Sequence, residues 1–151
     1  MKVVVQRSNE ASVKVKDTIV GKIEKGLVVL VGFTYGDTIK EIKYLANKIV
    51  NLRIFDDENG IMNKSIKDVG GSILSVSQFT LYADTNKGNR PSYVNALKEN
   101  EARILYDIFN EKLKSLGINV ETGIFREDMI VSITNIGPTT IIIEKKGDKN
   151  E

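Results

Sequence analysis

The 151-residue chain contains no histidine, no cysteine and no tryptophan, and only two prolines. Without histidine a Ser-His-Asp triad cannot form, and without cysteine there is no thiolate nucleophile, disulfide or cysteine-based zinc site. A metal site would need carboxylates alone, and the acidic stretch DDENG (56–60) lacks the spacing and length of a calcium-binding loop. We therefore expect no metal site, and most familiar chemistries are excluded.

The sequence also lacks the apolar run of about 18–20 residues that a membrane-spanning helix needs. Its opening, MKVVVQRSNE, does not have the layout of a signal peptide, so we expect a cytoplasmic protein without a membrane partner. The formal net charge is only +2, although residues 1–53 contain ten lysines and arginines against five acids. This imbalance permits one basic face for a polyanion, or simply scattered, solvated charges.

The apolar patterns predict a single α+β domain with a mostly antiparallel, barrel-like sheet and two long helices on one face. Strands are predicted over 2–15, 18–33 with a break at 25–26, 51–55, 71–81, 128–135 and 139–144. Asp37 is the predicted N-cap of a helix that runs to about Val50, with Ile39, Ile42, Leu45, Ala46 and Ile49 on one face. Pro91 suits the first turn of a second helix that ends near Leu116, before Gly117. Its predicted apolar stripe consists of Val94, Leu97, Ile104, Leu105, Ile108 and Phe109. The polar residues 145–151 are predicted to form a disordered tail.

One segment of interest is Ser77-Gln78-Phe79-Thr80, at the end of an apolar run. If the strand continues through it, Gln78 and Thr80 point to the same side and place an amide beside a hydroxyl. The same residues are also explained as polar groups that satisfy the backbone near a strand end.

The other segment is NIGPTT (135–140), in which Pro138 interrupts two strongly β-forming runs. A Gly-Pro step here can be an ordinary turn, or it can be a cis peptide bond, which is uncommon in proteins. A cis bond would fix the directions of two backbone carbonyls, and such a pair can recognise an amino group and test the shape of what is attached to it.

Together the two segments resemble the signature pair of the D-aminoacyl-tRNA deacylases, Ser-Gln-x-Thr and Asn-x-Gly-Pro-x-Thr. Four ordered blocks, VVVQR, NLRIFDDENGIMN, SQFTLYADTNKGNRPSY and NIGPTTIII, resemble this family over about residues 1–144. The resemblance implies a deacylase domain over 1–144 and a cofactor-free esterase. Such an enzyme removes D-amino acids, and glycine, from mischarged tRNA. It further implies a homodimer with active sites at the subunit interface.

In the site that the resemblance implies, the Gly137-Pro138 step is cis and enters the pocket of the other subunit. Its carbonyls hold the amino group of the substrate and leave no room for an L side chain. The predicted catalytic residues are Gln78, Phe79 and Thr80. Backbone N–H groups at these positions would stabilise an oxyanion, while the ribose 2′-hydroxyl of the substrate orients or activates water. We expect Thr80 to position the substrate or a water, because no base is available to make it a nucleophile.

The remaining predicted substrate-binding residues are Ser77, Asn135, Arg7, Phe125 and Met129. The resemblance implies that Arg7 holds the Gly-Pro step or a nearby carbonyl, and that Phe125 and Met129 line an adenosine pocket. Ordinary core packing also explains the two apolar residues. Lys87–Arg90 and the basic residues of 1–53 are candidates for phosphate contacts with aminoacyl-tRNA.

Two departures from the family pattern leave alternatives open. Arg126-Glu127 follows Phe125 where family members usually have Gly-Ala, and Ile136 stands where they usually have aspartate. The first departure gives weight to a non-catalytic RNA- or nucleotide-binding module that kept the pocket. An esterase or amidase for free D-amino-acid derivatives is a second alternative, and it would act without RNA.

Overall fold

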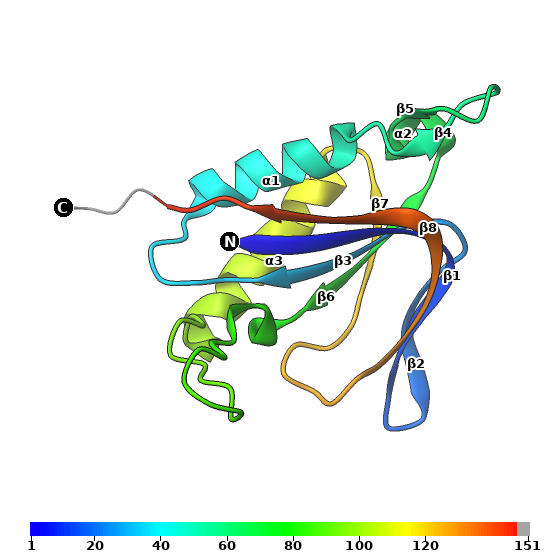
Figure 1. Cartoon of the computed structure of the whole chain (residues 1–151). Helices are drawn as coiled ribbons and strands as arrows, with labels where there is room; N and C mark the ends of the chain where they lie inside the picture. Colours follow the sequence, from blue (N-terminus) through cyan, green and yellow to red (C-terminus); the bar gives the residue numbers. More distant parts are fainter. Residues whose placement is uncertain (148–151) are drawn as a thin grey trace.

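A long, bent strand at the start of the chain, β1 (Lys2–Val15), organises the molecule (Figure 1). Along one edge it pairs antiparallel with β3 (Gly26–Gly32) and then with β2 (Thr18–Ile23). Along its other edge it pairs antiparallel with β8 (Ile130–Glu144), from Lys2 opposite Glu144 to Lys14 opposite Ile130. The sheet curls towards a barrel, and the start of β1 lies beside the end of β8, where Lys2 is opposite Glu144.

The sheet continues from β3 to β6 (Ser72–Ser77) and β7 (Asn119–Thr122), and both of these pairings are parallel. The strand order is β2-β1-β3-β6-β7 with β8 on β1, so three of the five pairings are antiparallel, as predicted. A separate short hairpin, β4 (Phe55–Asp56) and β5 (Met62–Lys64), closes around the predicted acidic turn. The strand predicted over 51–55 is wrong except for its last residue, because the preceding helix extends through Asn51.

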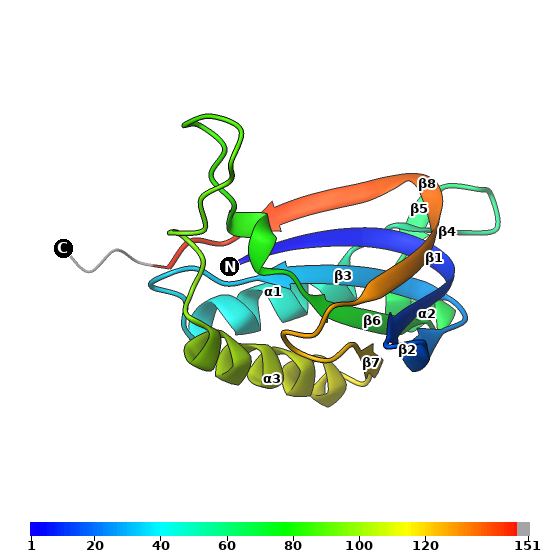
Figure 2. The ribbon, with the colours of Figure 1, turned by 90° about the horizontal axis from the view of Figure 1, so that it is seen from below.

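Helices α1 (Ile39–Asn51) and α3 (Glu99–Ser115) cover one face of the sheet, as predicted, and α2 (Ile66–Val69) is a single turn (Figure 2). The N-cap of α1 is Thr38, and the prediction of Asp37 is wrong by one residue. Glu41 completes a capping box by accepting a hydrogen bond from the backbone of Thr38 at 2.6 Å. Asp37 instead pairs with the buried α-ammonium group of Met1 at 2.6 Å.

Helix α3 begins at Glu99, so the prediction that it starts at Pro91 is wrong. Residues 91–98 form an exposed connection, pinned where the N–H of Leu97 donates to the carbonyl of Phe33. Two members of the predicted stripe, Val94 and Ile104, are 69% and 61% exposed. The buried face of α3 consists of Ala102, Tyr106, Phe109, Asn110 and Leu113. At the other end Gly117 adopts a φ of 89°, as its predicted position after the helix requires.

The core consists of two clusters on opposite faces of the sheet. The larger lies between the sheet and the helices and includes Val5, Leu27, Val29, Ile42, Leu45, Ile49, Tyr106, Phe109 and Leu113. The smaller lies inside the curl of the sheet and includes Ala11, Val13, Ile23, Val28, Leu74 and Val76. Strand β3 contributes to both, which confirms the prediction that it is buried on both faces.

The structure departs from the predicted strands at two places. Strand β6 ends at Ser77, and a 3₁₀ helix, η1 (Phe79–Tyr82), follows it, so the predicted strand alternation of residues 77–80 is wrong. Strand β8 runs through 136–138 where two strands were predicted, with irregular pairing to β1 at this point.

The structure is a computed structural model that describes residues 1–147. Part of the predicted tail therefore lies outside the described residues. Within 1–147 no helix is long and apolar enough to cross a bilayer.

Candidate active site

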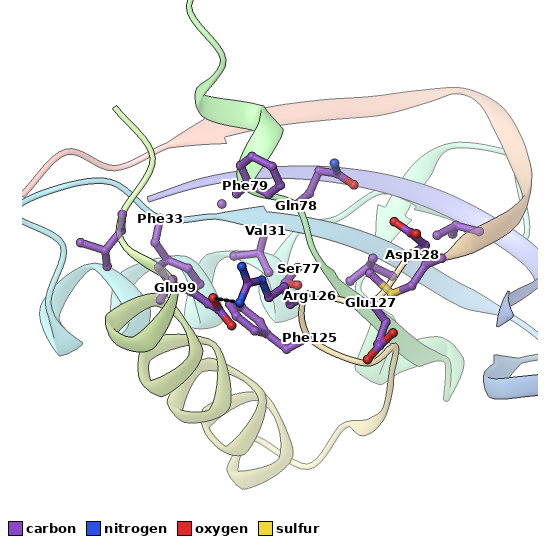
Figure 3. A pocket seen from close by; sticks show the side chains of 16 residues that line it. Val31, Phe33, Ser77, Gln78, Phe79, Glu99, Phe125, Arg126, Glu127 and Asp128 are labelled. Carbon is purple, nitrogen blue, oxygen red and sulfur yellow. Dashed lines mark ion pairs between the residues drawn. The ribbon is translucent and has the colours of Figure 1, made fainter. Parts of the chain in front are cut away.

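A pocket of about 430 Å³ lies where β6 ends, between η1, the first turn of α3 and the loop 123–129 that precedes β8 (Figure 3). Val31, Val76 and Val131 contribute an apolar part of its lining. Five of the predicted site residues also line it: Ser77, Gln78, Phe79, Phe125 and Met129. The structure therefore brings together residues that are up to 52 positions apart in the sequence.

The turn that ends β6 is held against β3 by backbone contacts. The N–H of Gln78 donates to the carbonyl of Val31 at 2.7 Å, and the N–H of Leu81 donates to the carbonyl of Gln78 at 3.2 Å. Gly32 permits this approach, because a Cβ atom there would lie 2.9 Å from the Gln78 carbonyl oxygen. Phe79 and Thr80 thus occupy the first two positions of η1, where backbone N–H groups have no partner within the helix.

The side chains of Gln78 and Thr80 interact directly, since the amide nitrogen of Gln78 donates to the hydroxyl oxygen of Thr80. Their proximity follows from the turn into η1, and not from the strand alternation that the sequence suggested. Thr80 itself is not among the residues that line the pocket. Among the described residues, no carboxylate forms a hydrogen bond with the Thr80 hydroxyl, which accepts from Gln78.

One wall of the pocket rests on an aromatic pair that the sequence analysis missed. Tyr106 packs against Phe125 with ring centroids 5.8 Å apart, and its hydroxyl donates to the carbonyl of Ser75 at 2.7 Å. Burial raises the pKa of Tyr106, so its hydroxyl remains a neutral donor. The spacing of apolar residues could have placed Tyr106 on the inner face of α3, but it gives no sign that this residue supports a pocket wall.

The mouth of the pocket is strongly charged. It carries three acids, Glu99, Glu127 and Asp128, together with Arg126. Arg126 forms an ion pair with Glu99 across the mouth (Figure 3). Its backbone φ is 70°, in the left-handed region that residues with a Cβ atom rarely adopt. The Arg126-Glu127 departure noted in the sequence therefore lies at the entrance of the pocket.

The other predicted site residues form a second cluster around the irregular part of β8. The side-chain amide of Asn135 donates to the carbonyls of Arg7 and Thr139, both at 3.0 Å. Arg7 is buried and donates to the carbonyls of Ile54 at 3.1 Å and Gly137 at 3.5 Å. These bonds hold the backbone of β8 at and around the Gly-Pro step.

Gly137 and Pro138 are themselves exposed, and the peptide bond between them is cis. A Cβ atom built on Gly137 would find no atom within 4 Å, so the space on that side of Gly137 is open. Neither residue, nor Arg7 or Asn135, lines the pocket of its own chain. The predicted site is thus divided within one chain into an open pocket and a projecting motif.

Comparisons with known proteins find similar sequences and structures that match nearly the whole chain. Residues 4–144 match the model of the family described as D-Tyr-tRNA(Tyr) deacylase. A D-aminoacyl-tRNA deacylase from Bacillus velezensis is 56% identical over 146 residues, which cover 97% of this chain and 99% of the relative. A D-aminoacyl-tRNA deacylase from Anoxybacillus flavithermus is 53% identical over 146 residues, which cover 97% of this chain and 100% of the relative. A solved structure described as c-Myc DNA Unwinding Element Binding Protein is 40% identical, with a TM-score of 0.91 over 97% of this chain and 100% of that one.

Proposed function

The chain belongs to the D-Tyr-tRNA(Tyr) deacylase family, and from this premise we propose that it hydrolyses the ester bond of D-aminoacyl-tRNA in the cytoplasm. The products are a free D-amino acid and tRNA, and the deacylase domain extends over residues 1–144. The observation that carries the proposal is the pocket at the end of β6, because its lining includes Ser77, Gln78 and Phe79 of the Ser-Gln-x-Thr motif.

The proposed chemistry uses the main chain and the substrate itself. A water oxygen attacks the ester carbonyl carbon, and the tetrahedral intermediate collapses with the ribose 3′-oxygen leaving and taking up a proton. The N–H groups of Phe79 and Thr80 stabilise the oxyanion, while that of Gln78 is already bonded to Val31. One such donor contributes about 2.7–4 kcal/mol to catalysis in comparable sites. The vicinal 2′-hydroxyl of the ribose orients or activates the water, so no histidine is required.

We assign Thr80 the role of positioning the substrate or a water molecule. Its hydroxyl accepts a hydrogen bond from Gln78, and a nucleophilic threonine needs a base in hydrogen-bond contact with it, which none of the described carboxylates of the pocket provides. An aminoacyl ester is far more reactive than an amide, so activated water is sufficient. Phe125 and Met129, at the other side of the pocket, would pack against the terminal adenosine.

Rejection of L-amino acids is assigned to Gly137 and Pro138 of a second copy of the chain. This part of the proposal is supported by the division of the site, since Gly137 and Pro138 are exposed and do not line the pocket of the same chain. In a homodimer the carbonyls of the motif would hold the substrate amino group and exclude an L side chain. Glycine has no side chain to exclude, so it would be hydrolysed as well.

The test compares hydrolysis of D-tyrosyl-tRNA and L-tyrosyl-tRNA by the wild type, Pro138→Ala and Thr80→Ala. We expect rapid loss of the D ester alone, reduced chiral selectivity in Pro138→Ala, and substantial activity in Thr80→Ala. Binding of tRNA without turnover would replace the proposal with an RNA-binding module. Equal turnover of D-tyrosine ethyl ester would instead favour an esterase for free D-amino-acid derivatives.

Mixing experiments address the shared site. Ser77→Trp fills the pocket and Pro138→Ala alters the motif, so each variant alone is expected to lose selective D-ester hydrolysis. If the motif acts on the pocket of the other subunit, a mixed dimer contains one intact pocket with one intact motif. Co-refolded variants should therefore recover up to about a quarter of wild-type activity, given random pairing. No recovery, with mixed dimers present by mass, would contradict the shared site.

A further inference from the structure

The mouth of the pocket is crossed by the ion pair between Arg126, in the loop after β7, and Glu99, the first residue of α3 (Figure 3). Glu99 also lies 3.7 Å from Arg103, one turn further along α3. The guanidinium of Arg103 in turn lies 5.0 Å from the centre of the Phe125 ring. One carboxylate therefore holds two arginine side chains beside the space that a ligand would occupy.

The charge of the mouth makes Arg126 decisive for an anionic ligand. Among the lining residues that the structure describes, Glu99, Glu127 and Asp128 are acids and Arg126 is the cation. Without Arg126 the entrance would repel a polyanion such as the 3′ end of an RNA. With Arg126 turned towards the ligand, and Arg103 beside it, the same entrance offers two guanidinium groups.

Stability does not account for an arginine at position 126. Its φ of 70° is unfavourable for any residue with a Cβ atom, and glycine would adopt it without strain. The side chain is 73% exposed, so it buries little surface. An exposed ion pair contributes little to folding, because water and salt screen it. The position and exposure of Arg126 instead suit a group that changes partner.

We propose that Arg126 and Arg103 form a phosphate-binding pair, and that Glu99 occupies the place of the phosphate until an RNA 3′ end enters the pocket. This inference rests on the proposed function, which puts the terminal adenosine against Phe125. The phosphate on the 5′ oxygen of that adenosine then lies at the mouth, within reach of both arginines. A guanidinium binds carboxylate and phosphate oxygens with the same paired geometry, so one ligand can replace the other.

The test measures equilibrium binding by calorimetry of two probes, a short single-stranded RNA ending in 3′-adenosine and free adenosine, which lacks the phosphate. Arg126→Gly should weaken binding of the RNA on the order of tenfold and reduce the slope of log Kd against log salt by about 0.7, as loss of one phosphate contact predicts. It should leave adenosine binding unchanged. Arg126→Lys should restore part of the RNA affinity, and Glu99→Gln should tighten RNA binding because it removes the competing carboxylate.

Lys114→Gln is the matched control. Lys114 pairs with Glu111 at 3.3 Å in the last turns of α3, so this variant also removes a cation from an ion pair, far from the pocket mouth. This variant should change the affinity for the RNA and the affinity for adenosine by no more than twofold. An equal loss of RNA and adenosine binding in Arg126→Gly, or no loss of either, overturns the phosphate pair.

Hydrolysis of D-tyrosyl-tRNA by the same proteins separates this inference from the proposed function. Selective RNA binding that depends on Arg126, with no hydrolysis by the wild type, would remove the enzymatic proposal and leave the phosphate pair in place. Hydrolysis by the wild type, with an unchanged KM in Arg126→Gly, would keep the enzymatic proposal and remove the phosphate pair.

Discussion

Gly32, at the end of β3, lies against the turn that carries Gln78, and we expect Gly32→Ala to slow catalysis more than it destabilises the protein. The backbone of Gly32 is outside the left-handed region, so alanine is compatible with its conformation. The added Cβ atom would lie 2.9 Å from the carbonyl oxygen of Gln78 and 3.2 Å from the Cβ atom of Leu81. Ordinary contact would require η1 to move away by about 0.5 Å.

The magnitude follows from this displacement. A misplacement of about 1 Å in a catalytic group can cost on the order of 100-fold in rate, so a shift of about half that size should reduce kcat on the order of tenfold. The N–H groups of Phe79 and Thr80 would move with η1, because this helix is the element that is displaced. Overpacking of this kind lowers the free energy of unfolding by about 1–3 kcal/mol.

The assay is steady-state hydrolysis of D-tyrosyl-tRNA at saturating substrate, which gives kcat, combined with urea denaturation of the same variant. Gly71→Ala is the control, because its Cβ atom would lie 3.1 Å from the Cα atom of Gly26, near the start of β6 and away from the pocket. We expect it to lose stability while keeping wild-type kcat. If Gly32→Ala also keeps kcat within twofold of the wild type, the position of η1 does not control the rate and the proposed oxyanion site is wrong.

Three further predictions concern stability. Burial raises the pKa of Glu41, but hydrogen bonds from the hydroxyl and N–H of Thr38 outweigh it and hold the pKa below its ordinary value of 4.5. The ionised form therefore stabilises the fold above pH 4.5, and Glu41→Gln should cost about 1–2 kcal/mol at neutral pH, a difference that disappears as the pH falls through the lowered pKa. Urea denaturation across this pH range measures it, and a pH-independent difference would contradict it. Tyr106→Phe should cost about 1 kcal/mol in thermal denaturation, since the carbonyl of Ser75 keeps its bond from the N–H of Gly123. Phe109→Ala should cost about 3–5 kcal/mol in urea denaturation, because the side chain is fully buried.

The parts of the fold that the sequence predicted are those in which local pattern and tertiary packing agree. The continuous apolar run of β3 predicted a strand buried on both faces, and the spacing of Ile42, Leu45, Ala46 and Ile49 predicted the inner face of α1. The errors occur where one local signal suits two structures. Pro91 is as suitable in the exposed connection as in a first helical turn. Tertiary contacts such as that of Leu97 with Phe33 hold the connection just before α3 begins.

The candidate site was predictable from motifs and not from pattern alone. Ser77, Phe125 and Met129 were proposed because the segments around them resemble a family, and the fold brings them to one pocket. Glu99 and Tyr106 were missed because helical spacing shows which face of α3 turns inward but not which end meets a pocket. The division between the pocket and the Gly137-Pro138 step was also invisible to local pattern, since it depends on the bend of β8.

The pairing of β1 with β8 has a consequence for the order in which the protein can be built. A chain made from its amino end presents β1, β2, β3 and α1 early, and these elements can already pair and pack. One edge of β1 must wait for β8, which supplies the partner of Lys2 only at Glu144. Met129 and Val131 reach the pocket with that same last segment. The pocket is therefore completed only after β8 has been made, and a nascent chain released before β8 would carry an open strand edge and no finished site.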